Sequence, residues 1–207
     1  MKKEPRAYRQ STRRVQAGLT RVLVLQAARD LLLGGSDAAG FTVDAVARQA
    51  GVARATVFNG FGGKPGLLQA LFDEMSDRAG LMDVDALLGQ PDAGQALADY
   101  VHAFGAFYEA ERGLLRKLKA YAALDADFAR LVAAREHKRT AGLLYLVQRL
   151  HGAAAKAAGA DQRRTARRLQ ALLAFEVFEA LAGSRRRLGS AAPDVLAMAH
   201  AIIGASP

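Results

Sequence analysis

The chain of 207 residues contains no cysteine and no tryptophan. Without cysteine it can form neither a disulfide bond nor a thiolate metal site, and a cysteine nucleophile is excluded. This composition suits a reducing compartment, so we expect a cytoplasmic protein. No uninterrupted apolar run approaches the roughly 20 residues that a membrane-spanning helix requires, so no membrane partner is expected.

Proline is scarce, with five residues, and runs of β-branched residues are also rare, whereas Ala and Leu are abundant. The apolar fraction of 51% and the charged fraction of 24% are those of an ordinary soluble protein. Ala and Leu favour helices, so we predict an all-α fold. At this length, a small module attached to a larger one is the natural arrangement.

The motifs of common enzymes are also missing. There is no GxSxG, P-loop or GxGxxG pattern, and the four histidines form no HxH or HExxH pattern. We therefore expect no catalytic residues, no metal and no other cofactor. An α-helical enzyme remains an alternative, with Glu176 and Glu179 at i, i+3 as a carboxylate pair that lacks an accompanying Glu-x-x-His pattern.

Positive charge is in excess, with a formal net charge of +9, and this points to a polyanionic partner such as double-stranded DNA. Residues 1–19 carry six basic residues and one acidic residue, without helical periodicity. We predict that they form a flexible basic arm, with Arg13 and Arg14 among its DNA contacts. A solubilising tail or a cloning remnant is the alternative.

The segment from Thr42 to Phe61 predicts two short helices joined by a turn. Its first part has an apolar stripe with i, i+3, i+4, i+7 spacing, formed by Val43, Val46, Ala47 and Ala50. Gly51 can end that helix and turn the chain, because glycine tolerates unusual backbone angles. The following stretch, Ala53 to Asn59, is long enough for about two helical turns. This is the pattern of a helix-turn-helix whose second helix reads DNA.

Other helices are predicted on both sides of this motif. The expected ranges are Thr20–Leu33, a helix from Lys64, then Gln95–Ala110, Asp125–Ala157 and Leu169–Ala182. Thr42 is a natural N-cap for the first helix of the motif. We divide the chain into the arm of residues 1–19, a helix-turn-helix domain of residues 20–68 and a larger helical domain of residues 69–207.

The range Leu169–Ala182 is apolar on most of its surface, so such a helix must be covered on more than one side. A homodimer sealed by a four-helix bundle would supply the second cover, and a core helix in a monomer is the alternative. The expected interface residues are Leu169, Leu173, Val177, Leu181, Val195 and Ile202.

Aromatic residues recur at helical spacing in the larger domain. They could line an apolar ligand pocket or form plain core. The candidate pocket residues are Tyr100, Phe104, Phe107, Tyr108, Tyr121, Phe128, Tyr145, Phe175 and Phe178.

Three features together resemble the TetR-like transcriptional regulators: Ala27-Ala28 in the first helix, TVDAVARQAGV in the second, and TVFNGFGGKPGLL from the third into the fourth. The resemblance covers Thr20 to Leu71. It implies a small-molecule-responsive regulator, most often a repressor that binds a palindromic operator as a homodimer. By extension we expect the larger domain to bind ligand and dimerise, with a small and largely apolar effector. An effector-independent, architectural DNA-binding protein is the alternative.

The resemblance also implies roles for individual residues. Those that would face bases are Arg54, Ala55 and Thr56, and those that would meet the DNA backbone are Thr42, Phe58, Asn59 and Lys64. Elementary chemistry agrees for Arg54, whose guanidinium can form two hydrogen bonds with the O6 and N7 atoms of guanine. Lys64 can pair with a phosphate as a point charge.

The chain departs from the family pattern at three positions. Ala53 stands where the family often has a serine cap, Phe58 where it often has tyrosine, and Gly60 where it often has histidine or tyrosine. Phe58 and Gly60 offer no side-chain hydrogen bond to phosphate. We therefore expect the basic arm to compensate for the weaker backbone contacts of the motif.

Overall fold

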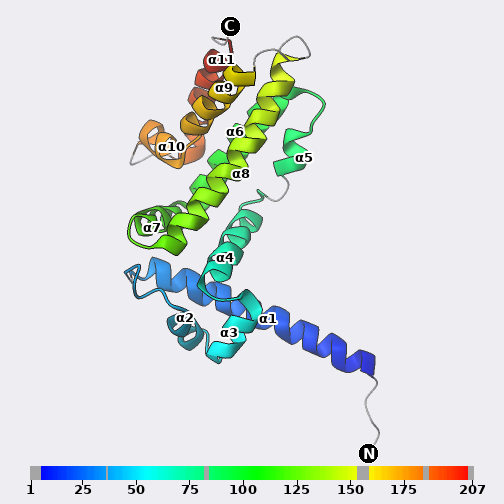
Figure 1. The fold of residues 1–207 in the computed structure, drawn as a ribbon, viewed down its shortest axis with the longest axis vertical. Coiled ribbons are helices and arrows are strands. Elements are labelled where there is room, and N and C mark those ends of the chain that lie inside the picture. Colours follow the sequence, from blue (N-terminus) through cyan, green and yellow to red (C-terminus); the bar gives the residue numbers. More distant parts are fainter. Residues whose placement is uncertain (1–5, 36, 82–83, 153–158, 184–186, 205–207) are drawn as a thin grey trace, which may run out of the picture. The chain divides into compact units, whose positions relative to one another are not determined.

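The computed structural model describes residues 6–35, 37–81, 84–152, 159–183 and 187–204, with the side chains of residues 6–13 excepted. Within these ranges all regular elements are helices, which confirms the predicted all-α fold (Figure 1). The elements are α1 (Arg6–Leu33), α2 (Val43–Gln49), α3 (Arg54–Phe61), α4 (Lys64–Arg78), α5 (Val84–Leu88), α6 (Ala93–Ala110), α7 (Arg112–Ala122), α8 (Ala126–His151), α9 (Gly159–Leu172), α10 (Phe175–Ala182), the 3-10 helix η2 (Leu188–Ala191) and α11 (Ala192–Gly204). In the part of the chain that is described, no helix combines the length and the apolar character needed to cross a bilayer.

The helices pack into two compact units. Unit 1 comprises the chain up to Glu74 together with Arg116–Leu131, and unit 2 comprises Met75–Leu115 together with the chain from Val132 onward. The predicted domain boundary after residue 68 did not include Arg116–Leu131, which also belongs to unit 1. The turn between α7 and α8 thus belongs to the unit that contains the helix-turn-helix.

Unit 1 is built around the C-terminal half of α1. Its buried residues follow helical spacing and share a core with the apolar stripe of α4: Val24, Leu25, Ala27, Ala28 and Leu32 from α1, and Leu67, Leu68 and Leu71 from α4. Arg29 closes the edge of this core with an ion pair of 2.7 Å to Glu74. The returning segment adds the ring of Phe128, which packs edge-on against Phe41 with ring centroids 5.5 Å apart.

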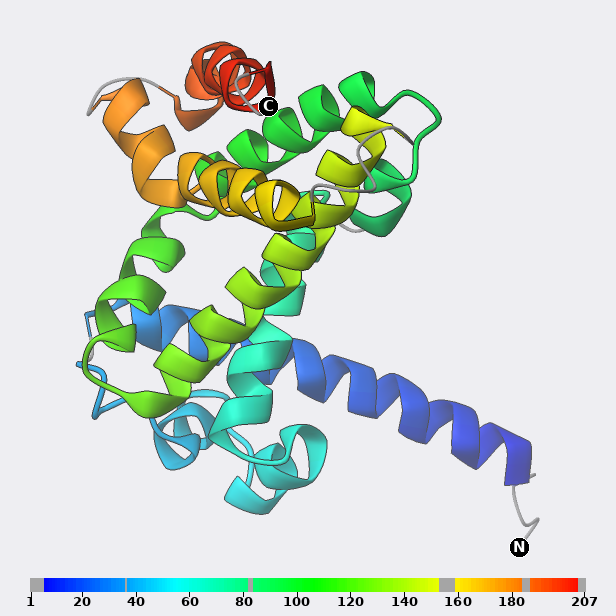
Figure 2. The same ribbon diagram turned by 45° about the horizontal axis from the view of Figure 1, so that its top comes forward.

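The first helix begins at Arg6 rather than near Thr20, so the prediction of a flexible arm is wrong for residues 6–19. The N-terminal half of α1 extends beyond α2 and α3 (Figure 2). Glycine and proline do not occur between Arg6 and Ala17, and extending a helix that is already anchored avoids the cost of nucleation. Residues 1–5 lie outside the described ranges. The segment is therefore a basic helix for most of its length.

Unit 2 is organised on α6, whose first turn is capped by Asp92: its carboxylate accepts hydrogen bonds from the backbone amides of Gly94 and Gln95. The buried face of α6 carries Leu97, Tyr100, Val101, Phe104, Phe107 and Tyr108. Gly105 allows close packing here, because a Cβ at this position would lie 3.2 Å from the Phe178 ring and 3.4 Å from the Gly189 backbone. The predicted range Gln95–Ala110 is thus confirmed as helix within α6.

The range Leu169–Ala182 is two helices, and the prediction of one continuous helix is wrong. The chain leaves helical geometry at Leu173 and Ala174, and Ala174 has extended backbone angles of φ −70° and ψ 147°. The hydroxyl of Tyr108 donates a hydrogen bond of 2.8 Å to the Leu173 carbonyl oxygen. The break is therefore stabilised by a side chain from α6, which satisfies a buried carbonyl group.

Three of the six expected interface residues are not available to a partner. Leu169, Leu173 and Val195 are fully buried in the core of unit 2, so predicting them as interface residues is wrong. The break between α9 and α10 changes which residues face outward. Val177, Leu181 and Ile202 are half-buried and keep part of their apolar surface exposed.

The predicted helix Asp125–Ala157 begins as expected, as α8 from Ala126, but it ends at His151 because Gly152 leaves helical geometry with a left-handed φ of 66°, so the predicted continuation is wrong. Its predicted end at Ala157 lies outside the described residues. Arg149 in the last turn of α8 donates hydrogen bonds to the carbonyl oxygens of Leu88, Gln90 and Pro91. One guanidinium group therefore holds the turn between α5 and α6 against α8.

Candidate nucleic-acid interface

The turn between α2 and α3 has the hydrogen bonds of a Schellman motif. Gly51 has a left-handed φ of 67°, its amide donates to the Arg48 carbonyl at 3.2 Å, and the Val52 amide donates to the Ala47 carbonyl at 3.0 Å. At the other end of α2, the Thr42 hydroxyl accepts a hydrogen bond of 3.1 Å from the Ala45 amide. The predicted roles of Gly51 and Thr42 in the backbone of this motif are confirmed.

The second helix of the motif presents a continuous exposed face. Val57 is fully buried and fixes the rotation of α3. Five of the residues that the sequence predicts to meet DNA lie on this helix, and all five are exposed: Arg54, Ala55, Thr56, Phe58 and Asn59. Phe58 is 57% exposed, a high value for a residue with so large an apolar side chain. The face is thus accessible to a DNA groove.

The N-terminus of α3 has no side-chain cap. Ala53 occupies the N-cap position with extended backbone angles, and no side chain bonds to the first amides of the helix. Arg54 follows directly and forms an ion pair of 3.4 Å with Asp44 of α2, with both side chains largely exposed. Because the first amides of a helix attract anions, this end of α3 is suited to approach phosphate.

Asp44 is absent from the residues predicted for the interface. It lies in the first turn of α2, where an acidic residue interacts favourably with the helix dipole. Its presence in the sequence is therefore explained without a contact to Arg54. Its contact with Arg54 depends on the angle between α2 and α3. The ion pair positions the guanidinium beside α2 in the DNA-free chain.

Helix α3 ends at a glycine pair, Gly62 and Gly63. Gly62 has a left-handed φ of 73° and its amide bonds to the Phe58 carbonyl at 2.7 Å. The Phe58 ring lies over Gly63, since a Cβ at Gly63 would be 3.7 Å from it. Nothing lies within 4 Å of a Cβ built on Gly60, so the surface there is open where the family often has a large side chain.

Lys64 forms an ion pair with Asp125, and this ion pair competes with the phosphate contact that the sequence predicts for Lys64. Its ammonium lies 2.7 Å from Asp125 Oδ2, and its side chain is only 17% exposed. It also lies 5.1 Å from the ring centroid of Phe128 and 5.9 Å from that of Phe41. A phosphate contact would require this ion pair to open, so in this conformation Lys64 stabilises unit 1.

Asp125 serves two elements at once. Its Oδ1 atom accepts hydrogen bonds from the backbone amides of Asp127 and Phe128 and so caps α8, while Oδ2 accepts from Lys64. Partial burial would raise the pKa of the Asp125 carboxyl, but the hydrogen bonds from Lys64 and from the two amides outweigh it. The pKa of Asp125 therefore lies below its usual range, and the carboxylate is charged near neutral pH.

The exposed half of α1 is both basic and apolar. Arg14 is exposed, and so are Val15, Leu19, Val22 and Leu23, which follow i, i+4, i+7, i+8 spacing. Arg13 is helical, but its side chain lies outside the described side chains. Further along, the Arg21 guanidinium lies 4.9 Å from the ring centroid of Phe61 and so links α1 to the end of α3.

The nine aromatic residues proposed for a ligand pocket do not form one cluster. Tyr121 and Phe128 belong to unit 1, with ring centroids 5.4 Å apart. Tyr145 is exposed on α8, with the Arg149 guanidinium 5.8 Å from its ring centroid. The other six are buried in unit 2: Tyr100, Phe104, Phe107, Tyr108, Phe175 and Phe178. Their neighbouring ring centroids lie 4.6 to 6.3 Å apart, which is the packing of a core, the alternative that the sequence left open.

One polar network borders these six rings. Arg139 donates from Nη1 to the Tyr108 hydroxyl at 2.6 Å and from Nε to Gln170 Oε1 at 3.1 Å. Its guanidinium also lies 5.7 Å from the ring centroid of Phe104. Burial raises the pKa of Tyr108 to about 12, although Arg139 opposes the shift, so the phenol stays protonated at neutral pH.

Comparison with known proteins identifies the helix-turn-helix segment. Residues 24–71 match the family model of the bacterial regulatory proteins of the tetR family. No curated protein matches the chain. The crystal structure of the TetR family repressor AlkX from Dietzia sp. strain DQ12-45-1b, implicated in biodegradation of n-alkanes, aligns with 88% of this chain and 96% of its own. Its identity to this chain is 19%, and the TM-score is 0.42.

The matched segment spans the buried half of α1, the capped helix α2, the exposed face of α3 and the apolar stripe of α4. Residues 24–71 therefore match the DNA-binding domain of the tetR family of bacterial regulatory proteins.

Proposed function

We propose that the protein is a ligand-responsive repressor that binds a palindromic operator as a homodimer. The observation that carries this proposal is the exposed face of α3, held by the buried Val57 and by the turn at Gly51. Two copies of such a helix, related by a two-fold axis, enter successive major grooves of the duplex. A small, largely apolar effector bound by unit 2 lowers the affinity for DNA, and by linkage DNA lowers the affinity for the effector equally.

Arg54 is the residue that reads sequence in this proposal. Its exposed guanidinium exchanges the partner Asp44 for the O6 and N7 atoms of guanine, a contact that contributes about 1 to 3 kcal/mol of discrimination. Ala55 and Thr56 lie beside it and contact neighbouring base edges. Asn59 and Thr42 meet the DNA backbone, which fixes the register without reading sequence.

The basic half of α1 supplies backbone affinity that Phe58 and Gly60 cannot. Arg14 is exposed on α1 and available to phosphates, and Arg13 precedes it on the same helix. Each phosphate neutralised by an arginine releases counterions, so the affinity of such a helix falls steeply with salt. Removal of residues 1–14 is expected to weaken DNA binding and to flatten its salt dependence, whereas identical salt slopes would contradict this role.

The homodimer uses the apolar surface that unit 2 leaves exposed on α10 and α11. Val177 and Leu181 on α10 and Ile202 on α11 are half-buried, and Met198 on α11 is 44% exposed. A charge placed in such an interface would be buried without a partner. Leu181→Asp is expected to convert a dimer to a monomer in analytical ultracentrifugation, with Leu124→Asp, at an exposed position of unit 1, as its control.

The effector is proposed to bind at the aromatic interior of unit 2. Six rings give an apolar environment, and the phenol of Tyr108 with the guanidinium of Arg139 provides one polar end. A ligand there would separate rings that now contact one another, so ligand binding and a change in helix packing would be coupled. The direct assay adds aromatic and aliphatic test compounds to the protein–DNA complex and measures whether they release the DNA.

The decisive experiment is a titration of the full-length protein onto duplexes from upstream of its own gene, followed by fluorescence anisotropy at several salt concentrations. Arg54→Ala should weaken binding to the preferred duplex far more than binding to a scrambled duplex. Arg130→Ala, on the exposed side of α8, is the charge-matched control. Equal affinity of the unaltered protein for preferred and scrambled sequences would contradict the repressor and favour an architectural DNA-binding protein.

A further inference from the structure

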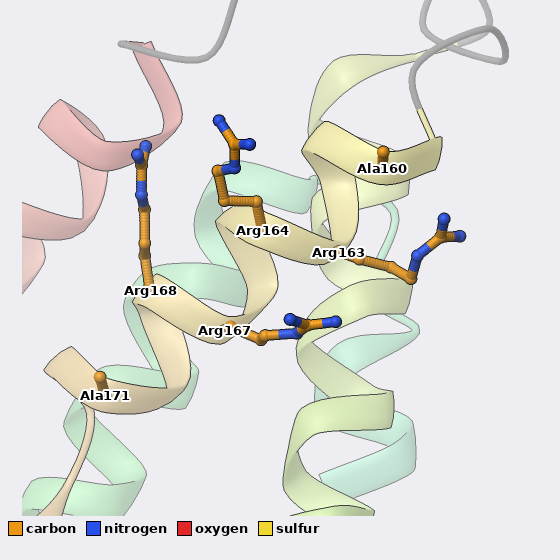
Figure 3. Close-up of a pocket in the computed structure, with 6 residues that line it drawn as sticks. All are labelled: Ala160, Arg163, Arg164, Arg167, Arg168 and Ala171. Atoms are coloured by element: carbon orange, nitrogen blue, oxygen red, sulfur yellow. The ribbon is translucent and has the colours of Figure 1, made fainter.

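The outward face of α9 carries four arginines. Arg163, Arg164, Arg167 and Arg168 line an open pocket of about 520 Å³, which Ala160 and Ala171 complete (Figure 3). Arg164 and Arg168 extend in one direction from the helix, and Arg163 and Arg167 extend in another. All four side chains are exposed. The four arginines, called here the arginine quartet, therefore form a cationic surface around one pocket, with two pairs of side chains.

The core of unit 2 fixes the direction in which the quartet faces. Gln162, Thr165, Ala166 and Leu169 are buried on the opposite side of the same helix. Because residues three and four positions apart share a helix face, burial of this set forces the arginines outward. The helix cannot turn to bring them to a carboxylate without exposing its apolar side.

The quartet has no compensating charge in the structure. Within the described residues, its four guanidinium groups form no ion pair or hydrogen bond, and Asp161 is the single acidic residue of α9. Two other arginines of unit 2 have polar partners: Arg112 bonds to Glu179 at 3.0 Å, and Arg139 bonds to Tyr108. Like charges at i, i+4 destabilise a helix, so the quartet weakens α9 when it is empty.

Its geometry fits a ligand with adjacent phosphate groups. Arg164 and Arg168, like Arg163 and Arg167, are four positions apart, which places their Cβ atoms about 5 to 6 Å from each other. Each guanidinium presents a planar fork that matches phosphate oxygens in pairs. Arg163 Nη1 lies 3.5 Å from where a Cβ on Gly159 would sit, over the first turn of α9. The start of the helix adds its own partial positive charge there.

Two other occupants fit this surface poorly. A second copy of the chain, docked here about a two-fold axis, would bring the two quartets together and repel. A lipid surface requires apolar side chains that enter the acyl region beside the cations, whereas the pocket is lined by arginine and alanine alone. A soluble anion can approach the guanidinium groups between the short alanine side chains.

We propose that the arginine quartet of α9 is a binding site for a soluble ligand that carries two or more adjacent phosphate groups. The site lies in unit 2 and does not depend on the operator, on the exposed face of α3 or on an apolar effector. Binding neutralises the repulsion between arginines and so stabilises α9. The pyrophosphate ion is the simplest probe of this chemistry.

Isothermal titration calorimetry of the full-length protein with pyrophosphate, at fixed ionic strength, tests the proposal. Arg164→Gln/Arg168→Gln should weaken pyrophosphate binding by roughly tenfold or more, because two charge-assisted contacts are lost. Both positions are exposed and helical, and glutamine is a good helix former, so the variant should fold. Circular dichroism checks that it does.

Arg130→Gln/Lys138→Gln is the matched control, since it removes two exposed cations from α8 and changes the net charge equally. The proposal expects this control to bind pyrophosphate as the unaltered protein does, and orthophosphate to bind more weakly than pyrophosphate. Equal affinity in both double variants would overturn it. A loss of scrambled-duplex affinity confined to the quartet variant, with unchanged pyrophosphate affinity, would assign the arginines to DNA and would also overturn it.

Discussion

The Tyr108 hydroxyl and the Leu173 carbonyl oxygen, 65 positions apart in the sequence, are joined by a hydrogen bond of 2.8 Å at the break between α9 and α10. The same hydroxyl accepts from Arg139, so one phenol connects three segments of unit 2. The orientation of α10, and with it the outward direction of Val177 and Leu181, depends on this contact.

Tyr108→Phe should therefore destabilise the protein by about 1 to 3 kcal/mol, because a buried carbonyl and a guanidinium each lose a partner. Tyr100→Phe is the matched control: it lies on the same face of α6, and within the described residues its hydroxyl makes no hydrogen bond. Urea unfolding measures the change in the free energy of unfolding for both variants. Equal losses in the two variants would show that ring packing, and not the hydrogen bond, is responsible.

Ala53→Ser should add the missing cap to α3. Ala53 already has the extended backbone angles of an N-cap residue, so a serine hydroxyl would reach the backbone amides of the first turn without rearrangement. The expected gain in the free energy of unfolding is about 0.5 to 2 kcal/mol. Ala55→Ser, two residues later and exposed, is the control and should give no gain. A loss of stability in Ala53→Ser would show that the start of α3 is held in another way.

Replacement by alanine should have opposite effects on stability at two glycines, Gly60 in α3 and Gly66 in α4. A Cβ on Gly66 would lie 1.8 Å from the Phe61 carbonyl oxygen, so Gly66→Ala must displace α3 from α4 and should cost about 1 to 3 kcal/mol or more. Gly60 is helical with open space around it, so Gly60→Ala should stabilise the protein by roughly 0.5 to 1 kcal/mol. Thermal unfolding of the pair checks both signs.

The Lys64–Asp125 ion pair predicts a dependence of stability on pH. Because the pKa of Asp125 is lowered in the folded protein, the pair contributes stability above the ordinary carboxyl value of 3.8 and loses it as the pH falls through the lower folded value. Asp125→Asn keeps a side chain that can cap α8 but removes the charge. It should cost about 1 to 3 kcal/mol at pH 7 and progressively less below about pH 4.

Asp127→Asn is the control for this pH series, since the ion pair between Asp127 and Arg130 is held by an arginine that is 68% exposed. Exposed pairs contribute little, so this variant should track the unaltered protein at every pH. If the effect of Asp125→Asn were constant from pH 3 to pH 7, the ion pair would not be its cause.

The parts of the DNA-binding face that could be predicted depend on signals within about 20 residues. The Thr42 cap, the turn at Gly51 and the missing cap at Ala53 each follow from one residue type at one position in a short pattern. The exposure of Arg54, Thr56 and Asn59 agrees with the predicted DNA-facing side of α3, while the burial of Val57 is added by the structure.

What could not be predicted depends on contacts between distant segments. Lys64 finds Asp125 across 61 positions, and no local pattern around either residue indicates the other. Similarly, Leu173 leaves its helix because Tyr108 is near, although Ala and Leu favour a continuous helix there. The start of α1 was placed too late because residues 6–19 lack an apolar stripe that faces a core, whereas an anchored helix needs none to continue.

Because residues 116–131 belong to unit 1, the DNA-binding domain is not complete within one continuous segment of the chain. A fragment cut after α4 would leave Phe41 without the Phe128 ring and Lys64 without its carboxylate. Recombination that joined residues 1–74 to a foreign effector domain would have to supply an equivalent α7–α8 corner.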